Sequence, residues 1–135
     1  MTHVSKNPVD KNTYFQILEG FIWLLSDLKS ESDMKLFLND FLTKTERIML
    51  AKRLALALMI TKGYETKIIT QILHVSTGTV YRMREWVDRG GSGLTLALKR
   101  LIIQEKLASF WKKVDNFIED NFMKMRMFPK VRSQD

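Results

Sequence analysis

The chain has 135 residues, of which 45% are hydrophobic and 27% charged, with a net charge of +7 and no cysteine. This balance fits one globular domain over residues 1–135, and the lack of cysteine excludes disulfides and thiolate metal sites. The amino-terminal residues lack the basic start and apolar run of a signal peptide. The longest apolar run, 54–60, is too short to cross a bilayer, so we expect a cytoplasmic protein without a membrane partner.

The positive charge is concentrated away from the amino terminus. Residues 1–42 carry a net charge of −2, residues 43–97 carry +5 and residues 98–135 carry +4. A basic region attracts polyanions such as DNA. A solvated basic face has the same composition, so the charge by itself leaves both interpretations open.

The first predicted element is a helix over residues 12–29. Its apolar side chains recur with a helical period and cover a broad face. Asn12 or Thr13 is expected to cap its start. A face this broad predicts packing against a partner chain or a second layer. A shorter helix is predicted at 34–42. Together, the helices of residues 12–42 are predicted to form the dimer interface.

A capping box opens the next predicted helix. Thr43 and Glu46 stand three positions apart, so each side chain can accept a hydrogen bond from the other residue's amide. The helix then runs over 46–62 without glycine or proline and is rich in strong helix formers. Its apolar residues surround it over 54–60, which predicts a central place in the core, and Gly63 is expected to end it.

Residues 66–87 match the pattern of a helix-turn-helix, with helices at 66–73 and 77–87 around a turn at 74–76. Counting from residue 66, this motif needs apolar side chains at positions 4, 8, 10, 15 and 18 and a small residue at position 5. The chain has Ile69, Leu73, Val75, Val80 and Met83 at the apolar positions and Thr70 at the small one. His74 takes the turn position where glycine is common, and histidine tolerates a positive φ better than most residues.

The same register predicts which side chains of the second helix face outward. The outward positions are Ser76, Thr77, Gly78, Thr79, Tyr81, Arg82 and Glu85. Ser76 is expected to cap the helix, whose amino end would enter a major groove of DNA. Thr77, Thr79 and Tyr81 would read base edges there.

Cations on both helices complete the predicted DNA-binding surface. Lys67, Arg82 and Arg84 would hold phosphates or guanines. Gly78 within a helix costs about 1 kcal/mol relative to alanine. A close approach of the backbone to DNA would explain this glycine.

The carboxyl-terminal part is predicted to be a loop followed by one long helix. Glycines in 89–93 make a hinge, and a helical pattern of apolar residues runs over 94–128. Pro129 is expected to stop the helix, leaving 129–135 as a flexible tail. With no strand pattern anywhere, the predicted fold class is all-α, with residues 43–93 forming the central helix and the helix-turn-helix head.

Residues 42–93 resemble the Trp repressor superfamily, in particular its bacterial Trp-repressor-like branch. The matching motifs are LTKTERIMLAKRL from Leu42, KG at Lys62, STGTVYR from Ser76 and WVDRGGSG from Trp86. The resemblance implies a helical bundle that forms an intertwined homodimer, in which the N-terminal helices of one chain wrap the other. It also implies a transcription regulator, which we expect to be a repressor. We expect it to bind double-stranded DNA at two half-sites about one helical turn apart.

The resemblance further implies tryptophan as a co-repressor. In that family two arginines sandwich the indole of the ligand, and the matching positions here are Arg53 and Arg82. Trp86 stands one turn after Arg82, where tryptophan-responsive members carry a small hydroxyl residue, so its indole would crowd or fill the pocket. We therefore expect no cofactor, with Arg53 making a salt bridge or dimer contact and Trp86 packing in the core or at the hinge.

Two other classes of protein share these features. Helical hairpins occur in proteins that bind no DNA, so a helical protein-interaction or dimerisation module is one alternative. A transposase-derived DNA-binding head without its catalytic domain is another. His3 and His74 are far apart in the sequence, so no metal site and no catalytic residue is predicted, and an enzyme is not expected.

Overall fold

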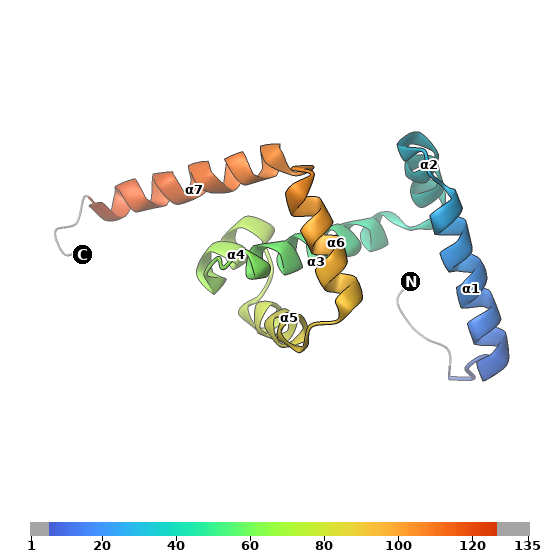
Figure 1. Ribbon diagram of the computed structural model, residues 1–135. Coiled ribbons are helices and arrows are strands. Elements are labelled where there is room, and N and C mark those ends of the chain that lie inside the picture. The colour runs from blue at the N-terminus through green and yellow to red at the C-terminus, as the bar shows by residue number, and fades with distance from the viewer. Residues whose placement is uncertain (1–5, 127–135) are drawn as a thin grey trace. The chain divides into compact units, whose positions relative to one another are not determined.

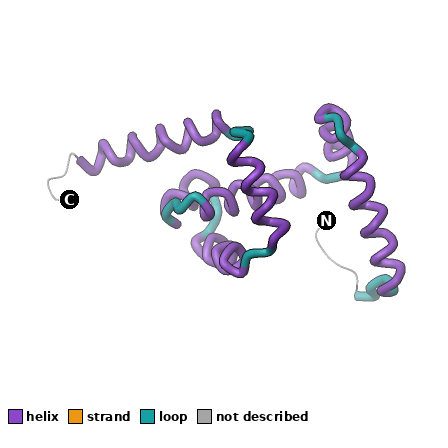
Figure 2. The backbone as a smooth tube through the Cα atoms, in the orientation of Figure 1, coloured by secondary structure: helices purple, strands orange, loops and turns teal. Residues whose placement is uncertain are grey.

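The computed structural model describes residues 6–126, with the side chains of residues 6–121. These residues form seven helices and no strand, which confirms the predicted all-α class (Figures 1 and 2). The helices are α1 (Lys11–Asp27), α2 (Glu31–Phe41), α3 (Lys44–Thr61), α4 (Thr66–Leu73), α5 (Thr77–Arg89), α6 (Ser92–Ile103) and α7 (Ala108–Arg126).

The chain divides into two compact units, and the boundary falls inside α3. The N-terminal unit is Met1–Arg53 and the C-terminal unit is Leu54–Asp135. The first holds α1, α2 and the beginning of α3, and the second holds the remaining helices. The expected tail at 129–135 and its stop at Pro129 lie outside the described residues.

Side-chain caps define the helix starts of the N-terminal unit. Asp10 caps α1, and its Oδ2 accepts from the Thr13 amide at 3.3 Å, so the predicted cap at Asn12 or Thr13 was wrong. The helix begins earlier than its apolar pattern, because an aspartate already precedes Lys11. Ser30 caps α2 and accepts from the Asp33 amide at 3.2 Å, which places this helix start ahead of the predicted residue 34.

The capping box of α3 is present as predicted. The Thr43 amide donates to Oε1 of Glu46 at 2.8 Å, and the Glu46 amide donates to the Thr43 hydroxyl at 3.1 Å. The hydrogen bond from the Thr43 amide lowers the pKa of the Glu46 carboxyl. One residue on, Nη1 of Arg47 donates to the carbonyls of Asn39 at 3.0 Å and Leu42 at 2.6 Å. The last carbonyls of α2, which lack partners within the helix, are thereby bonded to the next helix.

The N-terminal unit leaves most of its apolar side chains in contact with solvent. Three aromatic rings join α1 and α2: Phe41 lies 5.7 Å from Phe21 and stacks on Phe37 at 4.9 Å between centroids. Neither helix contains a buried residue. Trp23 is 64% exposed and Leu36 67%. The side chains of the broad apolar face predicted for the first helix are therefore half-buried or exposed within this unit, and none is fully covered.

The core lies in the C-terminal unit and has the second half of α3 at its centre. Every residue over 56–60 is buried, which confirms the central place predicted for this helix, whereas Leu54, at the start of the predicted stretch 54–60, is 39% exposed. The other helices each contribute side chains to the same cluster. These are Ile69 and Leu73 of α4, Val80 and Met83 of α5, Leu98 of α6 and Val114 of α7.

The single helix expected over 94–128 was wrong, because the chain breaks between α6 and α7. Glu105 adopts φ 51°, a left-handed conformation that ends an α-helix, and its amide bonds to the Ile102 carbonyl at 3.2 Å. After the break α7 runs in a new direction from α6 (Figure 1). The break brings Val114, which is 1% exposed, into the core cluster.

Candidate nucleic-acid interface

The turn between α4 and α5 has the geometry that the sequence predicted. His74 follows α4 with φ 55° and ψ 54°, in the left-handed region. Ser76 caps α5 in an extended conformation, and its Oγ accepts from the Thr79 amide at 3.1 Å. The reversal needs only one residue with positive φ, and that residue is the histidine predicted for it.

Buried side chains hold α4 and α5 together at the predicted offsets. Ile69 and Val80 are both 0% exposed, and Leu73 and Met83 are also buried. Val75, in the turn, is half-buried and packs against them. The five apolar positions of the helix-turn-helix pattern thus face the core, and the motif forms as predicted.

The opposite side of α5 is exposed near its amino end. Ser76, Thr77, Gly78 and Arg82 are exposed, and Tyr81 is 57% exposed. Thr79 is half-buried. These side chains lie at the amino end of one helix, where an anion is favoured electrostatically.

Three polar side chains at this end form one hydrogen-bonded group. Ser76 Oγ and Thr79 Oγ1 lie 2.8 Å apart, and Nη2 of Arg82 donates to Thr79 Oγ1 at 3.3 Å. Arg82 therefore lies back along the first turn of its own helix. A cation there is opposed by the helix dipole, whereas a phosphate bound there would be attracted by both the arginine and the helix.

Packing within the chain does not require a glycine at position 78. A Cβ built on Gly78 would meet Nη1 of Arg82 at 3.5 Å, which is ordinary van der Waals contact. Among the described residues, no other atom outside the helix backbone lies closer to that position. Close approach to a ligand outside the chain remains a prediction that this geometry allows.

Arg84 forms hydrogen bonds within the protein that were not predicted from the sequence. Its Nη2 donates to the Tyr64 carbonyl at 3.0 Å and to the Thr66 hydroxyl at 3.1 Å. The signal was present in the sequence: Arg84 lies four positions after Val80, on the same side of α5 as that buried valine. Its predicted contact with DNA is not tested by this geometry, but its guanidinium has partners within the head.

The remaining predicted residues lie on different elements. Lys67 is exposed on α4, where its carbonyl accepts from the Thr70 hydroxyl at 2.9 Å. Arg53 is exposed at the end of the N-terminal unit, whereas Arg82 and Trp86 belong to the C-terminal unit. Trp86 is about half exposed on α5. The effector pocket made of these two arginines and Trp86 stays a prediction from the resemblance.

The described residues contain neither a metal-ligand cluster nor a membrane-spanning helix. Within 6–126, no three histidine, aspartate or glutamate side chains gather as metal ligands would. In the same range, no helix has the length and apolar character needed to cross a membrane. His3 lies outside this range.

The core, the turn and the exposed end of α5 define a helix-turn-helix protein. A model of the Trp repressor family, described as "Trp repressor protein", matches residues 16–102, well over half of the chain. The chain belongs to the Trp repressor family, as its motifs predicted. Membership indicates DNA binding in transcription regulation, and proteins of this family are typically dimeric. The comparisons with curated proteins and with solved structures found no match.

Proposed function

We propose that this protein is a sequence-specific repressor of transcription that reads the major groove of double-stranded DNA through α5. The observation that carries the proposal is the exposed amino end of α5, mounted on a buried core by Ile69 and Val80. A helix held in this way can enter a major groove without disturbing the packing behind it.

The side chains divide into base-reading and phosphate-binding groups. Thr77 and Tyr81 are exposed and carry hydroxyls that suit base edges. The Arg82 guanidinium would give up its hydrogen bond to Thr79 and bind a phosphate or a guanine instead. Lys67 on α4 would add a phosphate contact. Arg84 is left out of the proposed contacts because its bonds to Tyr64 and Thr66 hold the head together.

The proposed assembly is a homodimer formed through the N-terminal unit. Trp23 on α1 and Leu36 on α2 are exposed apolar side chains that neither helix covers. Apolar surface concentrated on one part of a chain is typical of an interaction site. Two copies would cover each other and present two heads to successive major grooves.

We also propose that tryptophan is not the effector of this protein. Trp86 already carries a bulky indole one turn after Arg82 on α5. A free tryptophan added to the protein is therefore expected to leave the affinity for DNA unchanged, in a titration at fixed salt.

The test is fluorescence anisotropy of a labelled duplex of mixed sequence, titrated over a range of salt concentrations. Each neutralised phosphate contributes about −0.9 to the slope of log affinity against log salt. Wild type is expected to show a slope of several units, and Arg82→Ala a slope shallower by about one. Lys35→Ala is the matched control, because it also removes one cation, and Lys35 pairs only weakly with Glu31 at 3.9 Å on α2.

The outcomes separate the proposal from its alternative. Binding that is weakened by Arg82→Ala, left intact by Lys35→Ala and accompanied by an unchanged dimer supports a DNA-binding head. Absence of salt-dependent binding in wild type would overturn the proposal and favour a protein-interaction module. A dimer lost with Arg82→Ala would mark Arg82 as an interface residue instead.

A further inference from the structure

Tyr64 is held by its backbone three residues after the end of α3. Gly63, with φ 89°, donates its amide to the Ile60 carbonyl at 3.0 Å, and the Tyr64 amide donates to the Met59 carbonyl at 3.0 Å. These two bonds are those of a Schellman motif, in which glycine takes the left-handed position. Met59 is fully buried. Tyr64 is therefore tied by its backbone to the centre of the core.

The carbonyl of Tyr64 holds the DNA-reading helix. It accepts from Nη2 of Arg84 at 3.0 Å, and the same nitrogen also reaches Thr66. A hydrogen bond from a charged donor in a partly buried place is stronger than a neutral one. The later turns of α5 are thus attached to Tyr64, at the opposite end of α4 from the His74 turn.

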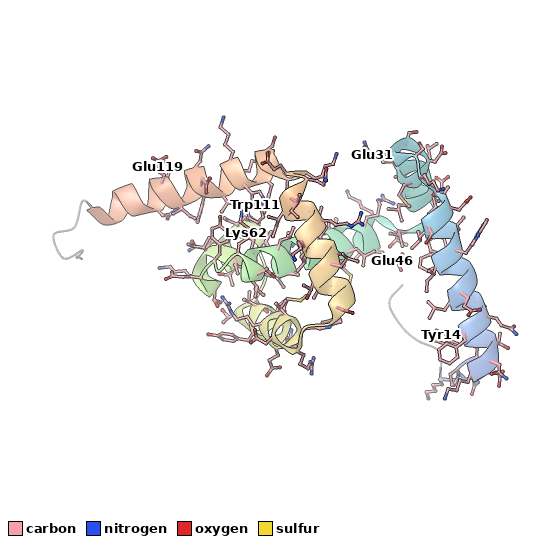
Figure 3. The ribbon with its side chains drawn as sticks, viewed as in Figure 1. Tyr14, Glu31, Glu46, Lys62, Trp111 and Glu119 are labelled. Carbon is pink, nitrogen blue, oxygen red and sulfur yellow. The ribbon has the colours of Figure 1, made fainter. Side chains whose placement is uncertain are left out.

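The ring of Tyr64 is held in turn by α7. It stacks on Trp111, with ring centroids 5.8 Å apart and planes 9° from parallel. Lys62, directly after α3, places its Nζ 3.9 Å from the centroid of the Trp111 ring on α7, and Figure 3 labels the two side chains next to each other. Burial and, secondarily, the charge of Asp115 raise the pKa of the Tyr64 phenol, as expected for a covered ring.

The helix that supplies Trp111 lies beyond the residues that the family model matches. The match to the Trp repressor family ends at Ile102, whereas α7 begins at Ala108. Val114, one turn after Trp111, is buried in the same core as α5. Helix α7 is therefore packed onto the head and touches Tyr64, the residue that anchors Arg84.

We propose that Tyr64 and Trp111 form a clamp through which α7 holds α5 in the orientation used for DNA contact. The inference rests on the proposed function of α5. Trp111 is a positioning residue, because it acts through Tyr64 and Arg84 and does not touch DNA. Through this clamp a helix of the same chain sets the orientation of the head.

The test is a double-mutant cycle on the full-length protein, with Trp111→Ala, Tyr64→Ala and the double variant. Two quantities are measured: affinity for the duplex, and amide hydrogen exchange across α5, which needs no DNA. Each single variant is expected to weaken DNA binding about fivefold to tenfold, at the low end of coupling between sites. Amide exchange in α5 should become faster in each single variant. The double variant should show the same affinity and the same exchange rate as the single variants, since each single substitution already removes the contact between the two rings.

Controls separate the clamp from a general loss of packing. Trp111→Phe keeps an aromatic ring for stacking and should restore wild-type affinity. Phe117→Ala removes a ring from the same helix at a position outside the described core cluster, and should leave affinity and α5 exchange unchanged. The salt slope should stay at the wild-type value in all variants, because no phosphate contact is removed.

The clamp and the proposed function fail in different ways. Additive effects of the two alanine variants, or wild-type exchange in α5 with Trp111→Ala, would overturn the clamp even when DNA binding is normal. If wild type binds no DNA, the proposed function fails, and faster, non-additive exchange in α5 would still establish that α7 holds α5 through Tyr64. Circular dichroism shows whether Trp111→Ala folds. If it does not, the affinities and α5 exchange rates of Tyr64→Ala and Trp111→Phe test the clamp in its place.

Discussion

The guanidinium of Arg84 and the carbonyl oxygen of Tyr64 lie 3.0 Å apart across 20 positions of sequence. One is in the second half of α5 and the other precedes α4, so the bond joins the two helices at the end remote from their turn. At the other end, the left-handed His74 sets the reversal. The angle between the helices is therefore held at both ends, with Ile69 and Val80 buried between them.

Loss of Arg84 is expected to destabilise the head. Arg84→Ala removes two charge-assisted hydrogen bonds and leaves the Tyr64 carbonyl unpaired, at a cost of about 1–3 kcal/mol in the free energy of unfolding. Arg82→Ala, at an exposed position on the same helix, should change the free energy of unfolding by less than about 0.5 kcal/mol. Urea denaturation followed by circular dichroism measures both. Equal effects of the two variants would argue against a structural role for Arg84.

Gly78→Ala is expected to separate stability from binding. A Cβ at this position fits beside Arg82 at 3.5 Å, and alanine is the better helix former, so the gain in stability should reach up to about 1 kcal/mol. The added methyl would stand between the backbone and a closely approaching DNA strand, so affinity should fall. Thermal unfolding and anisotropy on the same preparation give the two values. A variant that is more stable and binds as tightly as wild type would show that DNA does not approach this turn.

The capping box predicts a dependence of stability on pH. The pKa of Glu46 is lowered in the folded protein by the Thr43 amide, so its ionised form stabilises the fold at pH values above the unfolded pKa of about 4.3. This contribution is lost as the pH falls through the lowered folded pKa. Glu46→Gln should therefore be less stable than wild type at neutral pH and equal to it at about pH 2. A constant difference across this range, by urea denaturation, would contradict the assignment.

The proposed dimer predicts a specific effect of Trp23. Trp23→Glu places a charge on an apolar side chain that is exposed in the single chain, and should weaken dimerisation by more than about thirtyfold if the ring is central in the interface. Light scattering after size-exclusion chromatography, over a range of concentrations, measures the change. Lys35→Ala on α2 serves as the control and should remain dimeric. A wild-type protein that is monomeric at all concentrations would rule out this assembly.

Local patterns in the sequence determined the helix-turn-helix and the capping box of α3. The burial of Ile69 and Val80, the left-handed His74 and the reciprocal bonds of Thr43 and Glu46 all follow from spacings of a few residues. Such features are predictable because one turn of helix brings positions three and four apart onto the same side. The family match over 16–102 agrees with the motifs read from the same region.

Only the tertiary structure decided which distant groups meet. The bond from Arg84 to Tyr64, the stacking of Tyr64 on Trp111 and the break at Glu105 were not predicted. The apolar pattern over 94–128 is satisfied equally by one helix or by two, since periodicity records which side of a helix is apolar and not where the chain bends. The bend is decided by whether Val114 can reach a core built from α3, α4 and α5, and that depends on contacts between residues far apart in the sequence.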